Sequence, residues 1–328
     1  MALFGQLPFT VREFDRIRDY PGRAEVHNAS YPDRPVTVEE LKTWDESNNP
    51  DPKYLNRHFV AELEDGRIAA HLWYGHWPGM YHPQKLYFSL AVHPDFRRRG
   101  IGSALYEKTL AEITPHDPIR LTNVAYENQP DGLKFLRQRG FEERMRFWES
   151  YLDVQKFDPA PYERVIEKVA AGGIVIRSEA DLAGEADFER KLYEMLNEIT
   201  MDVPVPDPFT PEPFERFVEN RRKSINRIPE AYFIAIDSET GRYAGTSALW
   251  KSHAAAYLKT GLTGVRREYR RRGIALALKL RGIEYARQVG APGIKTDNES
   301  GNRPMLSINE MLGFERGTAE IDMSKKLK

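Results

Sequence analysis

The sequence contains no cysteine, and this excludes disulfides, thiolate metal sites and a cysteine nucleophile. It also has almost no net charge, because 48 Lys and Arg stand against 49 Asp and Glu, so no global attraction to nucleic acid is expected. No apolar run reaches the roughly 18 residues that a membrane span needs. The N-terminal residues show no cationic segment followed by an apolar one, so we expect no signal peptide. These absences predict a cytoplasmic protein with no metal, nucleic-acid or membrane partner.

What is present fits a globular protein with substantial cores. Apolar residues make up 41% and charged residues 30% of the 328 positions. That length exceeds one ordinary domain and suits two.

An internal repeat supports two domains. Val265 follows Val92 by 173 positions, Gly273 follows Gly100 by 173, and the Gly-Phe pairs at 140–141 and 313–314 keep the same offset. A constant offset over such a distance indicates duplication.

Each half has the same mixed order of strands and helices, which predicts an α/β fold with a mixed sheet. In the first half we expect a strand at 9–12, a helical stretch at 36–44, a hairpin through residue 73 and a strand at 85–92. Residues 155–161 hold two prolines, which break regular structure. We therefore predict an N-terminal domain over 1–154, a linker over 155–172 and a C-terminal domain over 173–328.

A strand, a basic turn and a helix recur in both halves. An apolar run ends at Val92, and Arg97-Arg98-Arg99-Gly100-Ile101-Gly102 leads into a helical pattern. The copy runs from Val265 through Arg270-Arg271-Arg272-Gly273-Ile274-Ala275. Free backbone N–H groups at a helix N-terminus bind phosphates, and glycine permits a close approach.

These turns resemble the acetyl-CoA signature Arg/Gln-x-x-Gly-x-Gly/Ala of the GNAT N-acetyltransferase superfamily, in the strand–turn–helix context of that family. The resemblance covers nearly the whole chain and implies two tandem GNAT acyl-CoA N-acyltransferase-like domains. It implies acetyl-CoA as co-substrate and a small amine-bearing molecule as acceptor, with no metal. Whether the protein is a monomer or a homodimer stays open.

The resemblance also implies which residues hold CoA. The backbone of Val92 and Val265 should bind the pantetheine arm, and Asn302 should contact it from the start of the last helix. The N–H groups and arginines of the turns should hold the pyrophosphate; these residues are Arg97, Arg98, Arg99, Gly100, Ile101, Gly102 and Ser103, with Arg270, Arg271, Arg272, Gly273, Ile274, Ala275 and Leu276 in the copy. The fuller pattern around Asn302 favours the second half as catalytic, whereas Gly102 makes the first turn the better cradle.

The proton donor is not identified. Many family members carry a tyrosine four residues before the glycine of Gly-Phe, and here Leu136 and Asn309 stand there. Leucine cannot donate a proton. The leading hypothesis is acetyl-CoA-dependent N-acetyl transfer, and the alternative is an acyl-CoA-binding regulatory or scaffold protein with little or no turnover.

Overall fold

The computed structural model describes residues 8–48 and 51–328. They form two compact units, each containing parallel and antiparallel strand pairs. Unit 1 takes the described residues of Met1–Arg144, together with His253–Ala255 and Ile321–Lys328. Unit 2 takes Met145–Ser252 and Ala256–Glu320. The mixed α/β class predicted from the repeat is confirmed.

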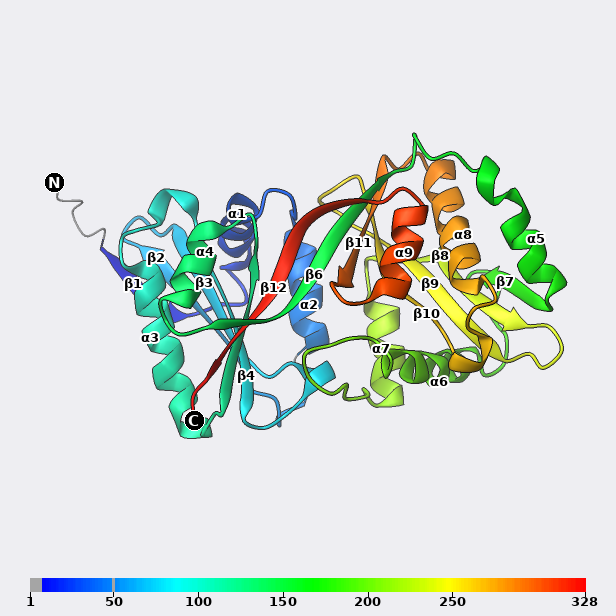
Figure 1. The fold of residues 1–328 in the computed structure, drawn as a ribbon. Helices are drawn as coiled ribbons and strands as arrows, with labels where there is room; N and C mark the ends of the chain where they lie inside the picture. The colour runs from blue at the N-terminus through cyan, green and yellow to red at the C-terminus, as the bar shows by residue number, and fades with distance from the viewer. Residues whose placement is uncertain (1–7, 49–50) are drawn as a thin grey trace. The chain divides into compact units, whose positions relative to one another are not determined.

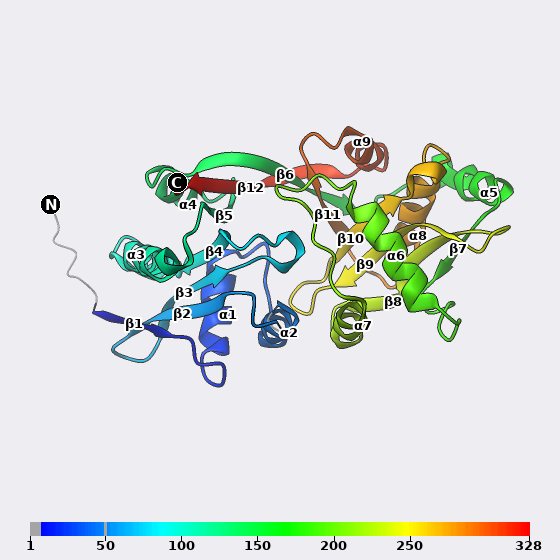
Figure 2. The same ribbon diagram turned by 90° about the horizontal axis from the view of Figure 1, so that it is seen from below.

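Unit 1 orders its strands β1-β2-β3-β4-β5, with β4 and β5 parallel and the earlier pairs antiparallel. In Figure 2, α1 and α2 lie on one side of β1–β4, and α3 lies on the other. The elements are β1 (Phe9–Glu13), α1 (Tyr20–Ser30), α2 (Val38–Asn48), β2 (Asn56–Leu63), β3 (Ile68–Gly75), η1 (Pro78–Met80), β4 (Lys85–Val92), η2 (Pro94–Phe96), α3 (Ile101–Ile113), η3 (Thr114–His116), β5 (Arg120–Tyr126) and α4 (Pro130–Arg137).

Unit 2 orders its strands β6-β11-β10-β9-β8-β7, with β10 and β11 parallel (Figure 1). From Ile174 to Met311, its strands and α-helices follow the same order as those of unit 1. Its elements are β6 (Glu142–Asp153), η4 (Ala160–Tyr162), α5 (Glu163–Ala171), β7 (Ile174–Ser178), α6 (Phe188–Thr200), α7 (Phe214–Lys223), β8 (Arg227–Asp237), β9 (Tyr243–Lys251), β10 (Leu258–Val265), η5 (Arg267–Tyr269), α8 (Ile274–Gln288), β11 (Gly293–Glu299) and α9 (Arg303–Met311). Strand β12 (Glu315–Lys326) begins in unit 2 and ends in unit 1.

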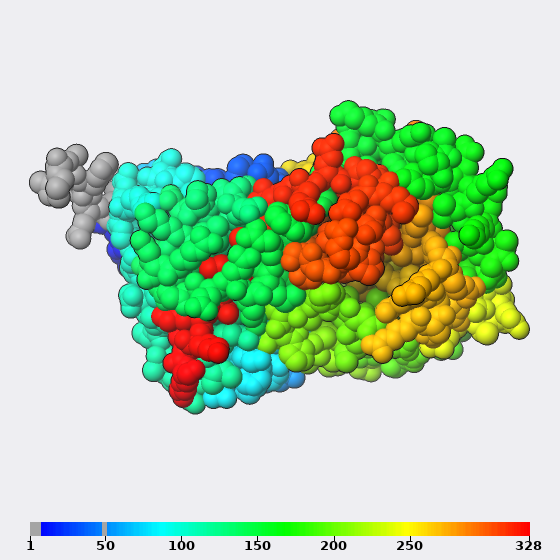
Figure 3. Space-filling model, in the orientation of Figure 1, coloured from blue at the N-terminus to red at the C-terminus, as the bar shows by residue number. Residues whose placement is uncertain are grey.

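Strands β6 and β12 each contain residues of both units. Strand β6 pairs with β11 in unit 2, from Glu299 opposite Phe147 to Gly293 opposite Asp153. The last residues of the chain lie in unit 1, where Leu327 N–H donates to the Ile119 carbonyl over 3.0 Å. Figure 3 shows these red C-terminal residues among the green and teal surface of unit 1. The predicted boundaries at 154 and 173 follow the sequence repeat and stay a prediction.

Alternating residues of β8 show how the sheet of unit 2 buries both faces. Ala231, Phe233 and Ala235 pack in a cluster with Ile274 and Leu278 of α8. The intervening Tyr232 and Ile234 pack instead with Leu192 and Met195 of α6. This two-residue period is the side-chain alternation of a strand, so helices are required on each side.

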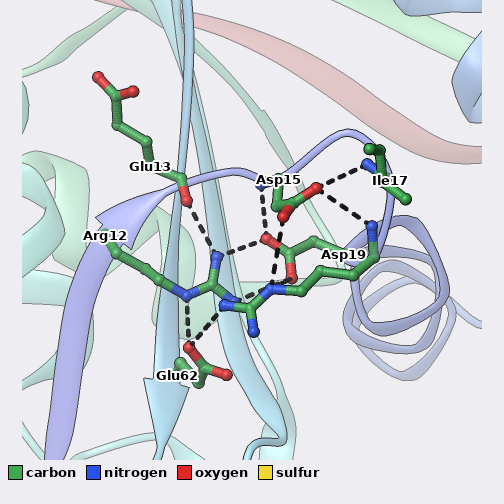
Figure 4. A network of polar contacts seen from close by, with 7 residues as sticks. Arg12, Glu13, Asp15, Ile17, Asp19 and Glu62 are labelled. Atoms are coloured by element: carbon green, nitrogen blue, oxygen red, sulfur yellow. Dashed lines mark hydrogen bonds and ion pairs between the residues drawn. The ribbon is translucent and has the colours of Figure 1, made fainter.

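A polar network fixes the start of α1 relative to β1 and β2 (Figure 4). The Arg12 guanidinium donates to Asp19 Oδ1 over 2.9 Å and also binds Glu62 of β2. Asp19 Oδ2 accepts from the Asp15 N–H over 2.7 Å, and Asp19 is only 3% exposed. A buried carboxylate with these partners is satisfied, so the network anchors the helix whose far end reaches the site described next.

Candidate functional site

The first turn, residues 97–103, has a backbone that only certain residues adopt easily. Gly100 is the N-cap of α3 with φ +83°, and Arg98 has φ +61°. The Arg97 Nε–H donates to the Val92 carbonyl over 3.0 Å, which ties the turn to the end of β4. The first N–H groups of α3 have no partner within the helix, so the turn offers donors at the positive end of a helix dipole.

The second turn, residues 270–276, repeats this geometry. Gly273 is the N-cap of α8 with φ +80°, and Arg271 has φ +61°. The Arg270 Nε–H donates to the Val265 carbonyl over 2.9 Å. Duplication has therefore preserved the local backbone as well as the sequence pattern.

In unit 1 the turn opens onto a cavity of about 320 Å³ between two diverging strands. The parallel register pairs Lys85–Tyr87 of β4 with Arg120–Thr122 of β5, and both strands then continue along opposite walls of the cavity. Asn123 Nδ2 donates to the Phe88 carbonyl over 2.9 Å where the strands separate. A cavity of this size lies within the range of small-molecule sites.

The cavity brings together six of the predicted residues of the first turn and strand, namely Val92, Arg97, Arg98, Gly100, Gly102 and Ser103. The other two lie outside the cavity lining. Ile101 is 1% exposed and belongs to the core, and Arg99 lies near the Phe96 ring, 5.9 Å from its centroid. Helix periodicity turns Ile101 inward while its neighbours face the groove.

Several lining residues were not predicted from the sequence. Ser30 and Tyr31 come from the end of α1, and the Ser30 hydroxyl donates to the Val92 carbonyl over 3.2 Å. Arg139 lies against the Phe135 ring at 3.6 Å from its centroid and donates to the Ser103 hydroxyl over 2.9 Å. Their contacts join segments distant in sequence, so no local pattern marks them.

The turn residues of the second half have other neighbours. Val265 and Ile274 are buried at 7% and 2% exposure, and Arg272 donates to the Gly172 carbonyl that follows α5. Ala275 and Leu276 pack against the hydrophobic core of unit 2. These side chains serve the packing of α8.

Asn302 caps α9, and its Oδ1 accepts from the Met305 N–H over 3.4 Å. The Asn302 side chain therefore caps the helix, and its predicted contact with CoA stays a prediction. The glycines of both Gly-Phe pairs, Gly140 and Gly313, have φ of +81° and +83°, which suits residues that follow a helix.

The two positions that carry tyrosine in many relatives are buried here. Leu136 is 3% exposed and lines the cavity of unit 1. Asn309 is 2% exposed and donates to Asn298 Oδ1 over 2.6 Å. Two acidic residues near the end of β11 also have partners: Asp297 pairs with Lys259, and Glu299 accepts from the Gly301 N–H. A donor in unit 1 must therefore come from another element.

Tyr31 is a phenol on the cavity wall. Burial raises its pKa, and the nearby Arg97 charge lowers it by a smaller amount. The hydroxyl therefore stays protonated near neutral pH, as a proton donor must. Residues that favour turns lie in the segment before Tyr31. The sequence therefore did not predict helix α1, which places Tyr31 on the cavity wall.

The first turn and its cavity fit the phosphate and thioester arm of an acyl-CoA. A Cβ on Gly102 would lie 3.5 Å from Phe135 and 3.7 Å from Val92, so a larger side chain would fill the groove. Arg97 and Arg139 supply positive charge to the cavity lining, where Arg98 is paired with Asp131. Within residues 8–48 and 51–328, no group of three His, Asp or Glu is arranged to hold a metal ion. None of the helices described there combines the length and apolar character needed to cross a membrane.

Comparison with known families identifies the class of protein. Residues 55–143 match the family described as acetyltransferase (GNAT) domain, and residues 191–314 match the acetyltransferase (GNAT) family. The chain therefore belongs to the GNAT acetyltransferases and carries two such domains in tandem.

Particular proteins are similar to this chain at low identity. A mycothiol acetyltransferase from Thermobifida fusca is 24% identical over 240 residues, which cover 71% of this chain and 72% of that protein. A GCN5-related N-acetyltransferase from Sphaerobacter thermophilus has a TM-score of 0.69 at 22% identity, covering 98% of this chain and 97% of its own. A tandem GNAT protein from the clavulanic acid biosynthesis pathway has a TM-score of 0.73 at 19% identity, covering 97% and 98%. The structural likenesses bear on the fold.

Proposed function

We propose that this protein is an acetyl-CoA-dependent N-acetyltransferase that acts on a small amine-bearing molecule at the cavity of unit 1. The observation that carries the proposal is the continuity between the first turn and the opening between β4 and β5. Family membership makes acetyl transfer the expected chemistry. The first half is thus our candidate for the catalytic half, although Asn302 had favoured the second.

Bound acetyl-CoA would supply an activated thioester. The N–H groups of the first turn and the charges of Arg97 and Arg139 would hold its phosphates. The protonated amine must first lose one proton, to solvent water, before it can attack. Its nitrogen loses a second proton to water as the carbon–nitrogen bond forms and the carbon–sulfur bond breaks. The leaving thiolate then takes a proton, for which we propose the Tyr31 hydroxyl because Leu136 offers none.

The first test is a screen of amines, amino acids and aminoglycosides with acetyl-CoA, in which free thiol is measured. We expect thiol release with at least one acceptor, and loss of that activity in Arg97→Ala. Arg137→Ala removes an exposed arginine of α4 outside the cavity lining and should keep it.

Tyr31→Phe separates the proposed donor from the binding site. It should lower kcat by roughly 100- to 10,000-fold, the range for loss of one acid catalyst, and leave acetyl-CoA affinity within about twofold. An unchanged kcat would remove Tyr31 from the mechanism while leaving the binding site intact.

The second candidate function is an acyl-CoA-binding regulatory or scaffold protein, favoured by Leu136 and Asn309 at the tyrosine positions. It predicts calorimetric binding of acetyl-CoA that depends on Arg97, without thiol release above the uncatalysed rate for any acceptor. Turnover that depends on Arg97 would exclude it.

A further inference from the structure

A carboxylate occupies the surroundings of the second turn. Asp202, just after α6, accepts from Arg267 Nε at 3.1 Å through Oδ1 and at 2.9 Å through Oδ2. Its oxygens also accept from the terminal nitrogens of Arg267 and Arg270. The Asp202 side chain is 18% exposed, so these ion pairs are partly shielded from solvent.

The hydrogen bond from Arg267 is the largest influence that holds the pKa of Asp202 down, to about 2, despite some burial. The carboxylate is therefore ionised at any pH at which the protein would be studied. A fixed negative charge lies where the family motif would offer its arginines to a phosphate.

The surroundings of the first turn differ in where the carboxylate lies. Asp131 pairs there with Arg98, and both side chains are more than half exposed, whereas Arg97 has a neutral neighbour. Arg97 makes the same Nε contact to the strand end as Arg270 does. Near Arg97, the residue that follows the opening helix is Tyr31, a protonated phenol on the cavity wall. Since the turn backbones match, the charge beside the first arginine is a principal difference between the two sites.

The opening helix of unit 2 also lies closer to its strand. A Cβ on Gly264 of β10 would lie 2.1 Å from Ile199 Cγ2, so glycine is required for α6 to pack there. The corresponding position in the repeat is Ala91, which lines the cavity of unit 1. Ile199 is 3% exposed and packs against Gly264, whereas Ala91, the counterpart of Gly264, lines the cavity of unit 1.

We propose that Asp202 acts as a built-in anion that neutralises Arg270 of the second turn and the adjacent Arg267, and that it excludes the pyrophosphate of CoA, so that the chain binds CoA at the first turn alone. A phosphate approaching Arg270 would have to displace a paired carboxylate or accept its repulsion, which disfavours it compared with the first turn. The proposal rests on the proposed function only in naming CoA as the ligand.

The test is calorimetric titration with CoA of a chain whose first site is filled by Gly102→Trp. We expect no measurable binding to this parent. Adding Asp202→Asn keeps the side-chain size, removes the charge and frees Arg267 and Arg270. CoA should then bind with a Kd at least tenfold below the weakest Kd that the titration can detect. Circular dichroism and melting curves establish that each variant is folded, and Arg97→Glu replaces Gly102→Trp if the latter unfolds.

Glu198→Gln is the matched control. Glu198 lies on the same helix α6 and pairs with Arg266 over 2.8 Å, next to the turn but outside its signature. It removes the same charge from unit 2 and should leave the parent unable to bind CoA. Equal gains in Asp202→Asn and Glu198→Gln would reduce the effect to net charge and overturn the assignment.

The remaining outcomes are also decisive. Binding by the parent with Asp202 intact would show an open second turn and overturn the proposal. No gain in folded Asp202→Asn would show that Asp202 does not close the turn and would overturn it as well. Should the unmodified chain fail to bind CoA while Asp202→Asn gains a site, the proposed function at unit 1 would fall and the role of Asp202 would stand.

Discussion

The turn that begins at Arg97 and the turn that begins at Arg270 present one backbone in two environments. In unit 1 the turn borders a cavity with a phenol and the arginines at its opening. In unit 2 the arginines pair with Asp202 and with the carbonyl of Gly172. The signature records the phosphate-binding conformation, whereas side chains from the opening helix and linker decide whether that conformation faces open space.

A matched pair of tryptophans gives the largest expected contrast between the two turns. Gly102→Trp should abolish CoA binding, because its side chain would enter the groove beside Phe135. Ala275→Trp, at the position that corresponds to Gly102 in the repeat, should leave CoA affinity within about twofold. Titration calorimetry on both folded variants is the measurement. The opposite pattern would move the working site to unit 2.

The local part of this site could be predicted because its causes are local. A strand, glycines at positive φ and a helix start are encoded within a dozen residues, and the repeat doubles the signal. The helix α1 was missed, since Pro21 and Gly22 indicate a turn. The structure explains that glycine: a Cβ there would lie 2.6 Å from Ile68, so α1 needs glycine to approach β3.

Missing α1 also meant missing Ser30 and Tyr31, which reach the cavity only through that helix. The pairing of Asp202 with Arg270 spans 68 residues, and no periodicity or spacing reports such a contact. Long-range contacts of this kind depend on how helices pack against the sheet. They distinguish the surroundings of the two turns, and the sequence pattern around Asn302, which favours the second half, contains no information about them.

Acid should destabilise unit 1 through His58, because the similar position in unit 2 holds a tyrosine, which does not titrate in acid. Burial lowers the pKa of His58 to about 3, whereas Tyr232 occupies the similar place in β8. A base with a depressed folded pKa loses its stabilisation as pH falls below its unfolded pKa near 6.5. Between pH 6.5 and about 3, His58 should cost about 1.4 kcal/mol per pH unit at most.

Chemical denaturation at pH 7, 6, 5 and 4 measures this loss in the wild type and in His58→Phe. The variant should lose less stability on acidification, whatever its stability at pH 7. Parallel pH curves for the two proteins would refute the assignment to His58. Hydrogen exchange resolved by residue should place the acid-sensitive opening in unit 1.

A buried lysine distinguishes the core of unit 2. Lys279 stands 173 positions after Tyr106, is 5% exposed and lies over the Phe314 ring at 5.1 Å from its centroid. Burial lowers its pKa to about 8, below the ordinary value of 10.5. Between pH 10.5 and about 8 the lysine is protonated in the unfolded chain and neutral in the folded one, so the free energy of unfolding decreases as pH falls through this range. At pH 7 the full loss is present.

Lys279→Met should raise the free energy of unfolding at pH 7 by roughly 1–3 kcal/mol, because it removes the desolvated charge and keeps the volume. The wild type should also gain stability relative to the variant between pH 8 and 10.5. Lys156→Met, at an 85% exposed side chain, is the neutral control. A net loss of stability in Lys279→Met would show that the contact with Phe314 outweighs the desolvation.

The smallest expected contrast concerns the caps of α4 and α9. Asn302 accepts from the Met305 N–H, whereas the N-cap of α4, Gln129, makes no side-chain cap bond and donates to the Ser30 carbonyl instead. Asn302→Ala should therefore cost about 1 kcal/mol of unfolding free energy, measured by urea denaturation, without changing CoA affinity. Gln129→Ala should lower CoA affinity through the displaced end of α1, with no loss from capping. A drop in CoA affinity in Asn302→Ala alone would restore the predicted contact of Asn302 with CoA and reopen the second turn as a binding site.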